Sequence, residues 1–580
     1  MPDSPTIFLD SFSKGNFASS WRFDDYVRTV AAGVSSEVSN VLKEVEEETG
    51  NGLYAVGYVS YEAAKALNQD LPAVQPVEGL PLAWFALFRK RYHVDNEKDH
   101  TLSTAETTLK PVKKIDDYAD DVRSILEYIA NGDCYQVNCT FPLKGTFSGN
   151  PLGLYHQIAK AQQASFSAYI DTGRFTVLSA SPELFFSVRN GIITTRPMKG
   201  TAKRGRWSAE DLAMVEKLLN SPKERAENLM IVDLLRNDLG IVAETGSVFV
   251  DKLFEVETYP TVHQMTSTIS ARLIAGKGIR DIFKALFPCG SVTGAPKKRS
   301  MEIITELEGA PRGVYCGAIG YVAPGGEAVF SVAIRTMLFD KMNSTLNMGV
   351  GSGITWDSIA EQEYDESISK GAFINQKLPD FQLIESFRLE KGEFAHLERH
   401  IVRLSESARY FGFSCDENKI RLTLADTAAN SSGLCKVRLL LAADGSYEIS
   451  SEPLNASDTA ISAGVSKIRT DSSNIYCYHK TTRREIYDIA RSNHPGCEEV
   501  LLLNEHGQLT EGSFHNLVLK IDGKLVTPPL TCGLLPGVLR EELFEQGTIS
   551  ERIMYPEDLK KAEEIWLINS VRGWRRCNII

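Results

Sequence analysis

Residues 175–201 of the sequence read FTVLSASPELFFSVRNGIITTRPMKGT. Three strand-like runs within it, 175–180, 184–188 and 191–195, are separated by short turns, and this pattern predicts consecutive β-strands. Hairpin-like neighbours of this kind favour an antiparallel sheet over a repeated βαβ arrangement, because only antiparallel strands can be joined by so few residues. The stretch therefore predicts a large antiparallel sheet.

Lys199 follows the last of these runs, in the segment Arg-Pro-Met-Lys-Gly-Thr (196–201). A lysine in a turn is most often a solvated surface group. The segments that accompany Lys199 along the chain favour a functional role for it instead. They are the segments 181–186, 224–228, 290–297 and 363–366, which carry glutamates, glycines and a further lysine.

Size and composition set limits on the class of protein. A chain of 580 residues predicts two to four domains, and 43% hydrophobic with 24% charged residues is typical of a soluble globular protein. The net charge of −12 argues against a general nucleic-acid binder. The first residues lack the pattern of a signal peptide and no stretch is apolar enough to span a membrane, so we expect a cytoplasmic protein. The ten cysteines form no Cys-x-x-Cys pair and are expected to be reduced thiols.

Two pairs of glutamates are spaced three residues apart on predicted helices. Glu224 and Glu227 lie in the helix expected at 221–235, and Glu363 and Glu366 lie in the one expected at 359–370. This spacing places both carboxylates of a pair on one helix face. Either pair alone is more often a solvated face, but two converging pairs would form the oxygen-donor shell that Mg²⁺ prefers.

In order and spacing, these segments resemble the chorismate-using enzymes, which include anthranilate synthase, isochorismate and salicylate synthases, and aminodeoxychorismate synthase component I. The resemblance implies that Glu224, Glu227, Glu363 and Glu366 hold Mg²⁺, which binds the ring carboxylate of the substrate. It implies that Tyr315 and Arg335 hold the enolpyruvyl carboxylate, and an arginine fork suits that task. The other substrate contacts that it implies are backbone amides at Gly351 and Gly353, the side chains of Thr293, Lys297 and Lys370, and His263 near the leaving hydroxyl.

Within this family, the segment Pro-Met-Lys-Gly-Thr resembles that of the aminodeoxychorismate members, which have a lysine at this position, whereas anthranilate synthases have alanine there. Isochorismate-forming members have a lysine base where this chain has Gln136. The implied mechanism is covalent: Lys199 attacks the ring at C2, and Glu183 acts as general acid and then as general base for ammonia. Because no cysteine stands in a Gly-x-Cys-x-Gly turn, the resemblance implies a separate glutamine amidotransferase subunit as the ammonia source.

The last 200 residues resemble the fold-type IV pyridoxal-phosphate (PLP) enzymes. Lys480 matches the Schiff-base lysine, Arg403 matches the arginine that binds the cofactor phosphate, and Glu511 matches the partner of the pyridinium nitrogen. Gly537, Val538 and Leu539 look like a turn that enters a helix, where free backbone amides can bind phosphate. The sequence separates a lyase from an aminotransferase poorly.

We therefore expect an α+β protein with three parts: residues 1–110 as the N-terminal part of the first module, 111–375 as the chorismate-binding domain, and 376–580 as the PLP-dependent domain. The leading hypothesis is an enzyme that makes 4-aminobenzoate for folate in two steps, amination of chorismate and then elimination of pyruvate. The enzymatic alternative is a chorismate aminase of the anthranilate synthase component I type fused to a PLP aminotransferase. A non-enzymatic alternative is a scaffold that binds the glutaminase, which the intact candidate residues argue against.

Overall fold

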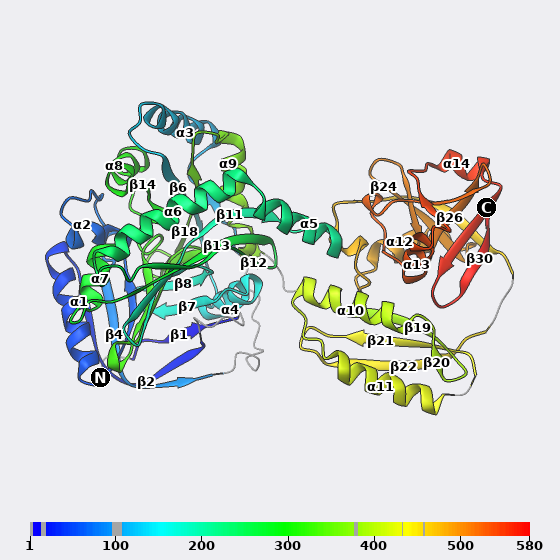
Figure 1. Ribbon diagram of the computed structural model, residues 1–580, viewed down its shortest axis with the longest axis horizontal. Helices are drawn as coiled ribbons and strands as arrows, with labels where there is room; N and C mark the ends of the chain where they lie inside the picture. Colours follow the sequence, from blue (N-terminus) through cyan, green and yellow to red (C-terminus); the bar gives the residue numbers. More distant parts are fainter. Residues whose placement is uncertain (1–3, 13–18, 95–106, 376–380, 432, 456–458) are drawn as a thin grey trace. The chain divides into compact units, whose positions relative to one another are not determined.

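The computed structural model describes residues 4–12, 19–94, 107–375, 381–431, 433–455 and 459–580. The chain forms two compact units (Figure 1): the first unit is residues 1–203 with 215–378, and the second unit is residues 204–214 with 379–580. The junction predicted at 376–380 and most of the polar segment from 95 to 110 lie outside the described residues.

The first unit is built on one large sheet in which every described pairing is antiparallel. Its strands are β1 (Ile7–Asp10), β2 (Trp21–Ala32), β3 (Tyr54–Val59), β4 (Ala83–His93), β5 (Lys110–Pro111), β6 (Gln136–Thr146), β7 (Phe166–Asp171), β8 (Phe175–Ser181), β9 (Leu184–Arg189), β10 (Ile192–Arg196), β11 (Met198–Lys203), β12 (Phe249–Thr258), β13 (Val262–Arg272), β14 (Gly294–Ala295), β15 (Ala318–Val322), β16 (Ala328–Val332), β17 (Thr336–Asp340) and β18 (Thr345–Ile354).

The three runs predicted in the stretch 175–201 form β8, β9 and β10, and the stretch also contains the start of β11, which the sequence pattern does not indicate. Strands β9 and β10 form a two-residue hairpin whose turn, Asn190-Gly191, has φ values of 52° and 74°. Asn-Gly is the preferred pair for a turn with two positive φ angles, which matches the right-handed twist of the strands. The prediction of a large antiparallel sheet is confirmed.

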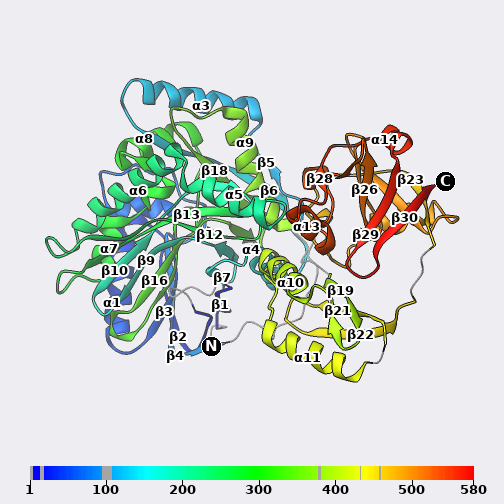
Figure 2. The same ribbon diagram turned by 45° about the vertical axis from the view of Figure 1, so that its right-hand side comes forward.

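Helices cover this sheet and carry part of the first candidate site. They are α1 (Ser35–Gly50), α2 (Ala64–Leu67), α3 (Ile115–Ala130), α4 (Pro151–Gln162), α6 (Pro222–Gly240), α7 (Ile279–Leu286), α8 (Lys297–Glu308) and α9 (Ala360–Ser369), with α5 (Ser208–Leu219) divided between the units. Short 3₁₀ turns are η1 (Tyr61–Ala63), η3 (Gly290–Val292), η4 (Pro324–Gly326) and η5 (Ala372–Asn375). Helix α6 begins after Ser221, whose side chain accepts a hydrogen bond from the Glu224 amide. It packs against β11 and β13 (Figures 1 and 2), so its first turn lies beside the Lys199 strand.

The second unit contains two sheets. The smaller has four strands, β19 (Leu383–Glu390), β20 (Glu393–Phe394), β21 (Cys435–Leu441) and β22 (Tyr447–Pro453), and shares one apolar core with α10 (Leu397–Phe411) and α11 (Glu417–Asn430). The larger is β23 (Ile461–Thr470), β24 (Glu499–Asn504), β25 (Leu509–Gly512), β26 (Asn516–Ile521), β27 (Lys524–Thr527), β28 (Ser550–Glu551), β29 (Glu564–Asn569) and β30 (Gly573–Ile579).

The larger sheet is mixed, since β23 pairs in parallel with β24 and β30 whereas β24–β25 and β29–β30 are antiparallel. Helices α12 (Glu485–Ser492), α13 (Val538–Glu545) and α14 (Pro556–Lys561), and the turns η6 (Ile475–Cys477) and η7 (Leu530–Cys532), complete the unit. The α+β class predicted for the chain is confirmed for both units.

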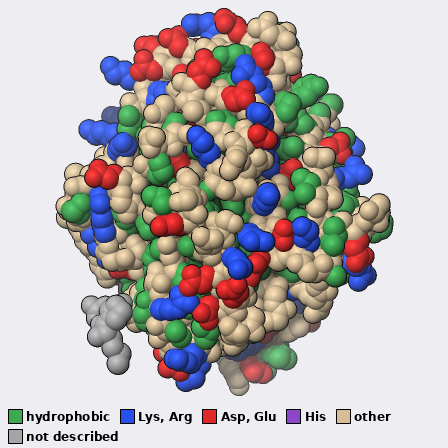
Figure 3. All heavy atoms as spheres, turned by 90° about the vertical axis from the view of Figure 1, so that its left-hand side faces the viewer, with side chains coloured by type: hydrophobic (Ala, Val, Ile, Leu, Met, Phe, Trp, Pro, Cys, Tyr) green, Lys and Arg blue, Asp and Glu red, His purple; other side chains and the backbone are tan. Residues whose placement is uncertain are grey.

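The surface shows no segregation of charge on the face of the first unit drawn in Figure 3, where Lys and Arg side chains alternate with Asp and Glu. Among the described helices, none combines the length and the apolar character needed to cross a bilayer.

Candidate active sites

The first cavity has a volume of about 190 Å³ and lies in the first unit. It brings together residues from β11, α6, β18 and α9 that are far apart in the sequence. Of the predicted site residues, its lining contains Glu183, Lys199, Glu224, Glu227, Tyr315, Arg335, Gly351, Gly353, Glu363, Glu366 and Lys370.

Lys199 is fixed through its backbone and buried at its amine. Asn228 donates a hydrogen bond from Nδ2 to the Lys199 carbonyl (3.1 Å), and Ser267 donates to Asn228 Oδ1 (2.6 Å). Desolvation in the cavity lowers the pKa of the Lys199 amine, although the charge of Glu227 opposes the shift. A lowered pKa raises the fraction of neutral amine, which is the nucleophilic form.

Glu183 lies in the turn between β8 and β9 and is only 3% exposed. Burial raises the pKa of its carboxyl to about 7, although Ser291 and the charge of Lys199 oppose this shift. Its Oε1 has no hydrogen-bond partner among the described residues. A carboxyl that titrates near neutral pH and keeps a free oxygen in a cavity can both donate and accept a proton.

The four predicted metal-binding glutamates line the same cavity from two helices, Glu224 and Glu227 from α6 and Glu363 and Glu366 from α9. Burial raises the pKa of Glu224 and of Glu227, and neighbouring carboxylates add to both shifts. Burial would also raise the pKa of Glu366, but its ion pair with Lys370 (2.8 Å) outweighs this and lowers it.

Carboxylate oxygens are the ligands that Mg²⁺ prefers. A divalent cation among these four glutamates would also offset the repulsion between their charges. Among the described residues, however, no group of three or more acidic, histidine or cysteine side chains lies close enough to hold a metal ion as the side chains stand. Magnesium binding by these four residues therefore stays a prediction.

The groups predicted to hold substrate carboxylates line the same cavity. Tyr315 packs so closely on Gly349 that a Cβ there would lie 2.0 Å from its Cδ1. Arg335 donates from Nη1 to Gln162 Oε1 (2.6 Å), which leaves further guanidinium donors available. Lys370 Nζ donates to the Gly351 carbonyl (2.9 Å), so this lysine links α9 to β18.

Three predicted substrate contacts lie outside the lining of the first cavity. Lys297 Nζ contacts Asp238 Oδ2 (2.7 Å) and donates to the Leu286 carbonyl (2.9 Å). Thr293 Oγ1 donates to the Cys289 carbonyl (3.1 Å), and His263 Nδ1 lies 3.0 Å from Thr258 Oγ1. Their described bonds hold structural elements together, and their contact with a substrate stays a prediction.

Two glutamines belong to the surroundings of Lys199. Gln136 is fully buried with neither amide atom paired among the described residues, and its Nε2 lies 2.6 Å from the position of a Cβ on Gly353. Gln264 lines the cavity and donates from Nε2 to the Gly200 carbonyl (3.0 Å). No motif marks Gln264, and only its register opposite Thr201 in the β11–β13 pair could have indicated it.

The second cavity lies in the second unit and has a volume of about 310 Å³. Its lining contains the predicted cofactor residues Arg403, Lys480, Glu511, Gly537 and Val538, whereas Leu539 lies outside it. Burial lowers the pKa of Lys480 to about 8, and the charge of Arg403 acts in the same direction.

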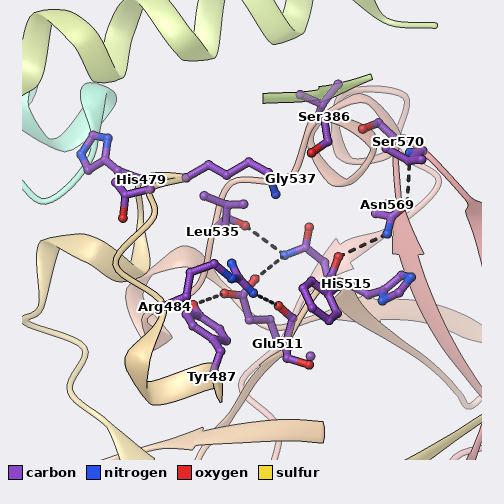
Figure 4. A pocket seen from close by; sticks show the side chains of 18 of the residues that line it. Ser386, His479, Arg484, Tyr487, Glu511, His515, Leu535, Gly537, Asn569 and Ser570 are labelled. Atoms are coloured by element: carbon purple, nitrogen blue, oxygen red, sulfur yellow. Dashed lines mark hydrogen bonds between the residues drawn. The ribbon is translucent and has the colours of Figure 1, made fainter. Parts of the chain in front are cut away.

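Glu511 is buried at the inner wall of this cavity (Figure 4), where Tyr487 donates to its Oε1 (2.8 Å) and Asn516 donates to its Oε2 (3.2 Å). Burial raises the pKa of this carboxyl to about 7. A buried carboxyl held by two donors presents its oxygens in one orientation, as recognition of a pyridinium N–H requires.

Arg403 is oriented by a carboxylate that no sequence motif marks. Its Nε and Nη2 donate to the two oxygens of Glu385 (2.9 and 2.8 Å), and its Nη1 donates to the Pro536 carbonyl (3.0 Å). His400 Nδ1 lies 2.6 Å from Glu385 Oε2. A guanidinium has five N–H donors, so two remain for a phosphate.

Gly537 precedes α13, and a Cβ on it would lie 1.9 Å from Asn516 Oδ1, so a larger residue there would displace the Asn516 side chain. The free amides of the first turn of α13, the remaining donors of Arg403, the amine of Lys480 and the Glu511 carboxyl suit the phosphate, aldehyde and pyridine nitrogen of PLP. The residues present therefore fit this cofactor.

Residues 205–207 pack against the loop that carries Lys480, within the second unit. Trp207 stacks on Tyr478 with 5.0 Å between ring centroids, and Arg206 Nη1 donates to the Tyr478 hydroxyl (3.0 Å). Tyr410 donates to the Gly205 carbonyl (2.8 Å). This segment lies only a few residues after the Lys199 strand in the sequence, and nothing in its composition indicates the contact.

Comparison with known proteins identifies a protein family for each of two segments of the chain. Residues 98–376 match the family described as chorismate binding enzyme, and residues 382–580 match the family described as amino-transferase class IV. The chain joins a chorismate-binding domain to a class IV amino-transferase domain. Both resemblances drawn from the sequence motifs are thereby confirmed.

The chorismate-binding domain is similar to aminodeoxychorismate synthase component 1 of Klebsiella aerogenes, with 46% identity over 255 residues that are 44% of this chain and 56% of the relative. It is also similar to anthranilate synthase component 1 of Aquifex aeolicus, with 40% identity over 44% of this chain and 51% of the relative. The chain thus spans little more than half the length of these curated relatives. The crystal structure of anthranilate synthase component I from Streptococcus pneumoniae has a TM-score of 0.54 and 28% identity, covering 65% of this chain and 93% of that one.

Proposed function

We propose that the chain makes 4-aminobenzoate from chorismate in two steps. The first unit replaces the C4 hydroxyl of chorismate with ammonia to give 4-amino-4-deoxychorismate. The second unit eliminates pyruvate from that product to give 4-aminobenzoate. The observation that carries the proposal is that Lys199 and Glu183 line one cavity and Lys480, Arg403 and Glu511 line another.

In the first step, the neutral amine of Lys199 forms a bond to C2 of the ring as the double bond shifts and the C4–O bond breaks. Glu183 donates the proton with which the C4 hydroxyl leaves as water, and its pKa of about 7 suits both this role and the reverse one. Ammonia then forms a bond to C4 as the C2–Nζ bond breaks, and Glu183 takes the excess proton. The net change is chorismate plus ammonia to aminodeoxychorismate plus water.

Tyr315 and Arg335 would orient the enolpyruvyl carboxylate, and the backbone of Gly351 and Gly353 would accept the ring close to Lys199. Glu224, Glu227, Glu363 and Glu366 would hold Mg²⁺, whose charge would offset that of the substrate. The alternative is amination at C2 to give anthranilate, favoured by the similarity to the Aquifex enzyme. A lysine nucleophile would occupy C2 and direct ammonia to C4 instead.

In the second step, bound PLP would supply an electron sink for the substrate amine. Lys480 would remove the ring proton, and its lowered pKa favours the neutral amine that this requires. Glu511 would hold the pyridine nitrogen, and Arg403 with the first turn of α13 would hold the phosphate. Aromatisation of the ring drives the loss of pyruvate. A separate glutaminase subunit would supply the ammonia.

The test is to incubate the purified chain with chorismate, an ammonium salt, Mg²⁺ and PLP, and to identify the products by chromatography and mass spectrometry. We expect 4-aminobenzoate and pyruvate in equal amounts. Anthranilate as the product would contradict the first assignment. Accumulation of aminodeoxychorismate with no 4-aminobenzoate would contradict the second.

A further inference from the structure

The lining of the second cavity carries far more positive than negative side chains. Six of its residues are lysines or arginines: Arg403, Lys436, Lys480, Arg483, Arg484 and Arg572. Within the lining that the structure describes, Glu511 is the one carboxylate, although the chain as a whole has a net charge of −12. Such a local excess of positive charge favours an anionic ligand.

The cofactor accounts for only part of this excess, because Arg403 and Lys480 are the residues expected to hold it. Lys436 and Arg572 line the cavity from two different sheets: Lys436 lies in β21 of the smaller sheet, and Arg572 lies in the β29–β30 turn of the larger sheet. Among the described residues, Arg572 has no carboxylate within ion-pair distance, and its Nη1 donates to the Asn455 carbonyl (3.4 Å).

Both cations act on the same exposed carboxylate. Lys436 Nζ lies 2.8 Å from Glu452 Oε1, and the Glu452 side chain is 65% exposed. Lys436 lowers the pKa of Glu452, and the charges of Arg438 and Arg572 contribute in the same direction, although Arg438 does not line the cavity. Exposed pairs of this kind are weak, so a ligand carboxylate that is anchored elsewhere in the cavity can replace Glu452.

We propose that Lys436 and Arg572 form a carboxylate-binding subsite at the edge of the second cavity, and that this subsite selects a substrate with two carboxylates. The inference rests on the proposed function, because aminodeoxychorismate is such a substrate: an amino-substituted ring acid with an enolpyruvyl carboxylate. An ordinary amino acid with one carboxylate lacks the group that would occupy the subsite. The subsite thereby favours the lyase substrate over aminotransferase substrates.

The backbone holds both cations in place. Lys436 pairs with Arg388 on one side and with Glu452 on the other, so its strand is internal to the smaller sheet. The Arg572 amide donates to Asn569 Oδ1 (2.7 Å), and Asn569 Nδ2 donates to the Phe514 carbonyl (3.2 Å). Figure 4 shows Ser386 and Ser570, which also line the cavity, near one another and away from Arg484 and Glu511.

The first test is the steady-state kinetics of the PLP-loaded chain with aminodeoxychorismate as the substrate. Lys436→Met and Arg572→Met should each raise KM about two- to fivefold, the range for a partly exposed charge pair, and leave kcat within about twofold. Glu452→Gln should lower KM, because it removes the competing carboxylate. Arg438→Met is the matched control, since Arg438 lies two residues along the same strand face but outside the cavity lining, and should leave KM unchanged.

The second test measures binding without turnover. Calorimetry with the PLP-loaded chain compares 3-[(1-carboxyvinyl)oxy]benzoate, which has two carboxylates, with benzoate, which has one. The wild-type chain should bind the dicarboxylate more tightly, and Lys436→Met and Arg572→Met should reduce that preference about two- to fivefold each. The visible absorption of the bound cofactor and the circular dichroism spectrum check that each variant is folded and loaded.

The outcomes separate the two levels of inference. Loss of the dicarboxylate preference in the variants, together with a wild-type chain that makes no 4-aminobenzoate, would support the subsite and overturn the lyase reaction. An active wild-type chain whose variants keep both KM and the dicarboxylate preference would overturn the subsite alone. Equal effects of Arg438→Met and Lys436→Met would also overturn it, because a general change in surface charge would then explain both.

Discussion

Lys199 Nζ lies 2.8 Å from the position that a Cβ would occupy on Gly353, and Gln136 Nε2 lies 2.6 Å from it. Both atoms are ends of flexible side chains, so a methyl group there would displace the amine and leave the sheet intact. We predict that Gly353→Ala lowers the rate of chorismate amination about 100-fold, because a misplacement of about 1 Å has an effect of that size. The measurement is aminodeoxychorismate formation with ammonia as the nitrogen source.

Gly351→Ala provides the contrasting control. A Cβ on Gly351 would lie 2.4 Å from the Cys139 carbonyl oxygen, which is backbone of the neighbouring strand β6. Here the strands themselves must move, so we expect a lower Tm together with the loss of activity. If Gly353→Ala lowers the Tm as much as Gly351→Ala does, displacement of Lys199 is not the cause of its effect.

Lys199→Ala should abolish aminodeoxychorismate formation, by roughly a thousandfold or more, because the nucleophile is removed. The same variant should convert supplied aminodeoxychorismate to 4-aminobenzoate at the wild-type rate, since Lys480 lies in a separate cavity. Product analysis with each substrate in turn measures both steps. Undiminished amination by Lys199→Ala would rule out the covalent mechanism.

Removal of Mg²⁺ by EDTA should stop the first step and leave the second unaffected. Glu227→Gln and Glu366→Gln should each reduce the rate of the first step by about 100-fold or more, because each removes a candidate Mg²⁺ ligand. Adding more Mg²⁺ should not restore the rate. Glu361 lies in the same helix as Glu366 but outside the cavity lining, and Glu361→Gln controls for the same change of charge. Chorismate consumption that persists in EDTA would show that the metal assignment is wrong.

Much of this architecture could be predicted from local sequence. The strands around residues 175–201 follow from apolar runs and an Asn-Gly turn, and both glutamate helices occur where the acidic i, i+3 pairs indicate them. Lys199 and Lys480 could also be identified from local sequence, because each lies within a short motif that is itself recognisable. Their roles in the reaction stay predictions.

Contacts between distant segments could not be predicted. Glu385 contacts Arg403 because β19 and α10 share a core, and an isolated glutamate in a strand gives no sign of such a partner. The stacking of Trp207 on Tyr478 joins positions separated by more than 250 residues. Lys297 and Thr293 occur in a family motif, yet their side chains bond to Asp238 and Cys289 and lie outside the lining of the first cavity.

The rate at which PLP attaches to the PLP-free chain should rise about tenfold per pH unit below pH 8 and level off above it. Only the neutral amine of Lys480 can react, and its pKa is lowered from 10.5 to about 8. Stopped-flow absorbance measures the rate, and borohydride reduction followed by mass spectrometry identifies the lysine. Lys480→Ala should show no attachment. A rate that keeps rising to pH 10 would mean that the amine is not desolvated.

Glu385→Gln should destabilise the second unit by about 3–5 kcal/mol, the usual cost of leaving one charge of a buried pair without its partner. The side chain of Glu385 is 1% exposed, that of Arg403 is 11% exposed, and both Glu385 oxygens accept hydrogen bonds from the guanidinium. Burial would raise the pKa of Glu385, but the charge of Arg403 and the contact with His400 outweigh it and lower the pKa to about 2. Because the folded pKa lies below the ordinary value of 4.5, this contribution is complete above pH 4.5 and is lost as the pH falls toward 2. Urea unfolding followed through the cofactor absorption should therefore separate wild type and variant at pH 7, and the difference should shrink as the pH falls below 4.5.

Glu398→Gln is the control. Glu398 also accepts two hydrogen bonds from an arginine, Arg421, but its side chain is 74% exposed. We therefore expect no measurable change in stability. Equal stabilities of the two variants at pH 7 would contradict the prediction, because the buried Glu385–Arg403 pair would then contribute no more to stability than the exposed Glu398–Arg421 pair.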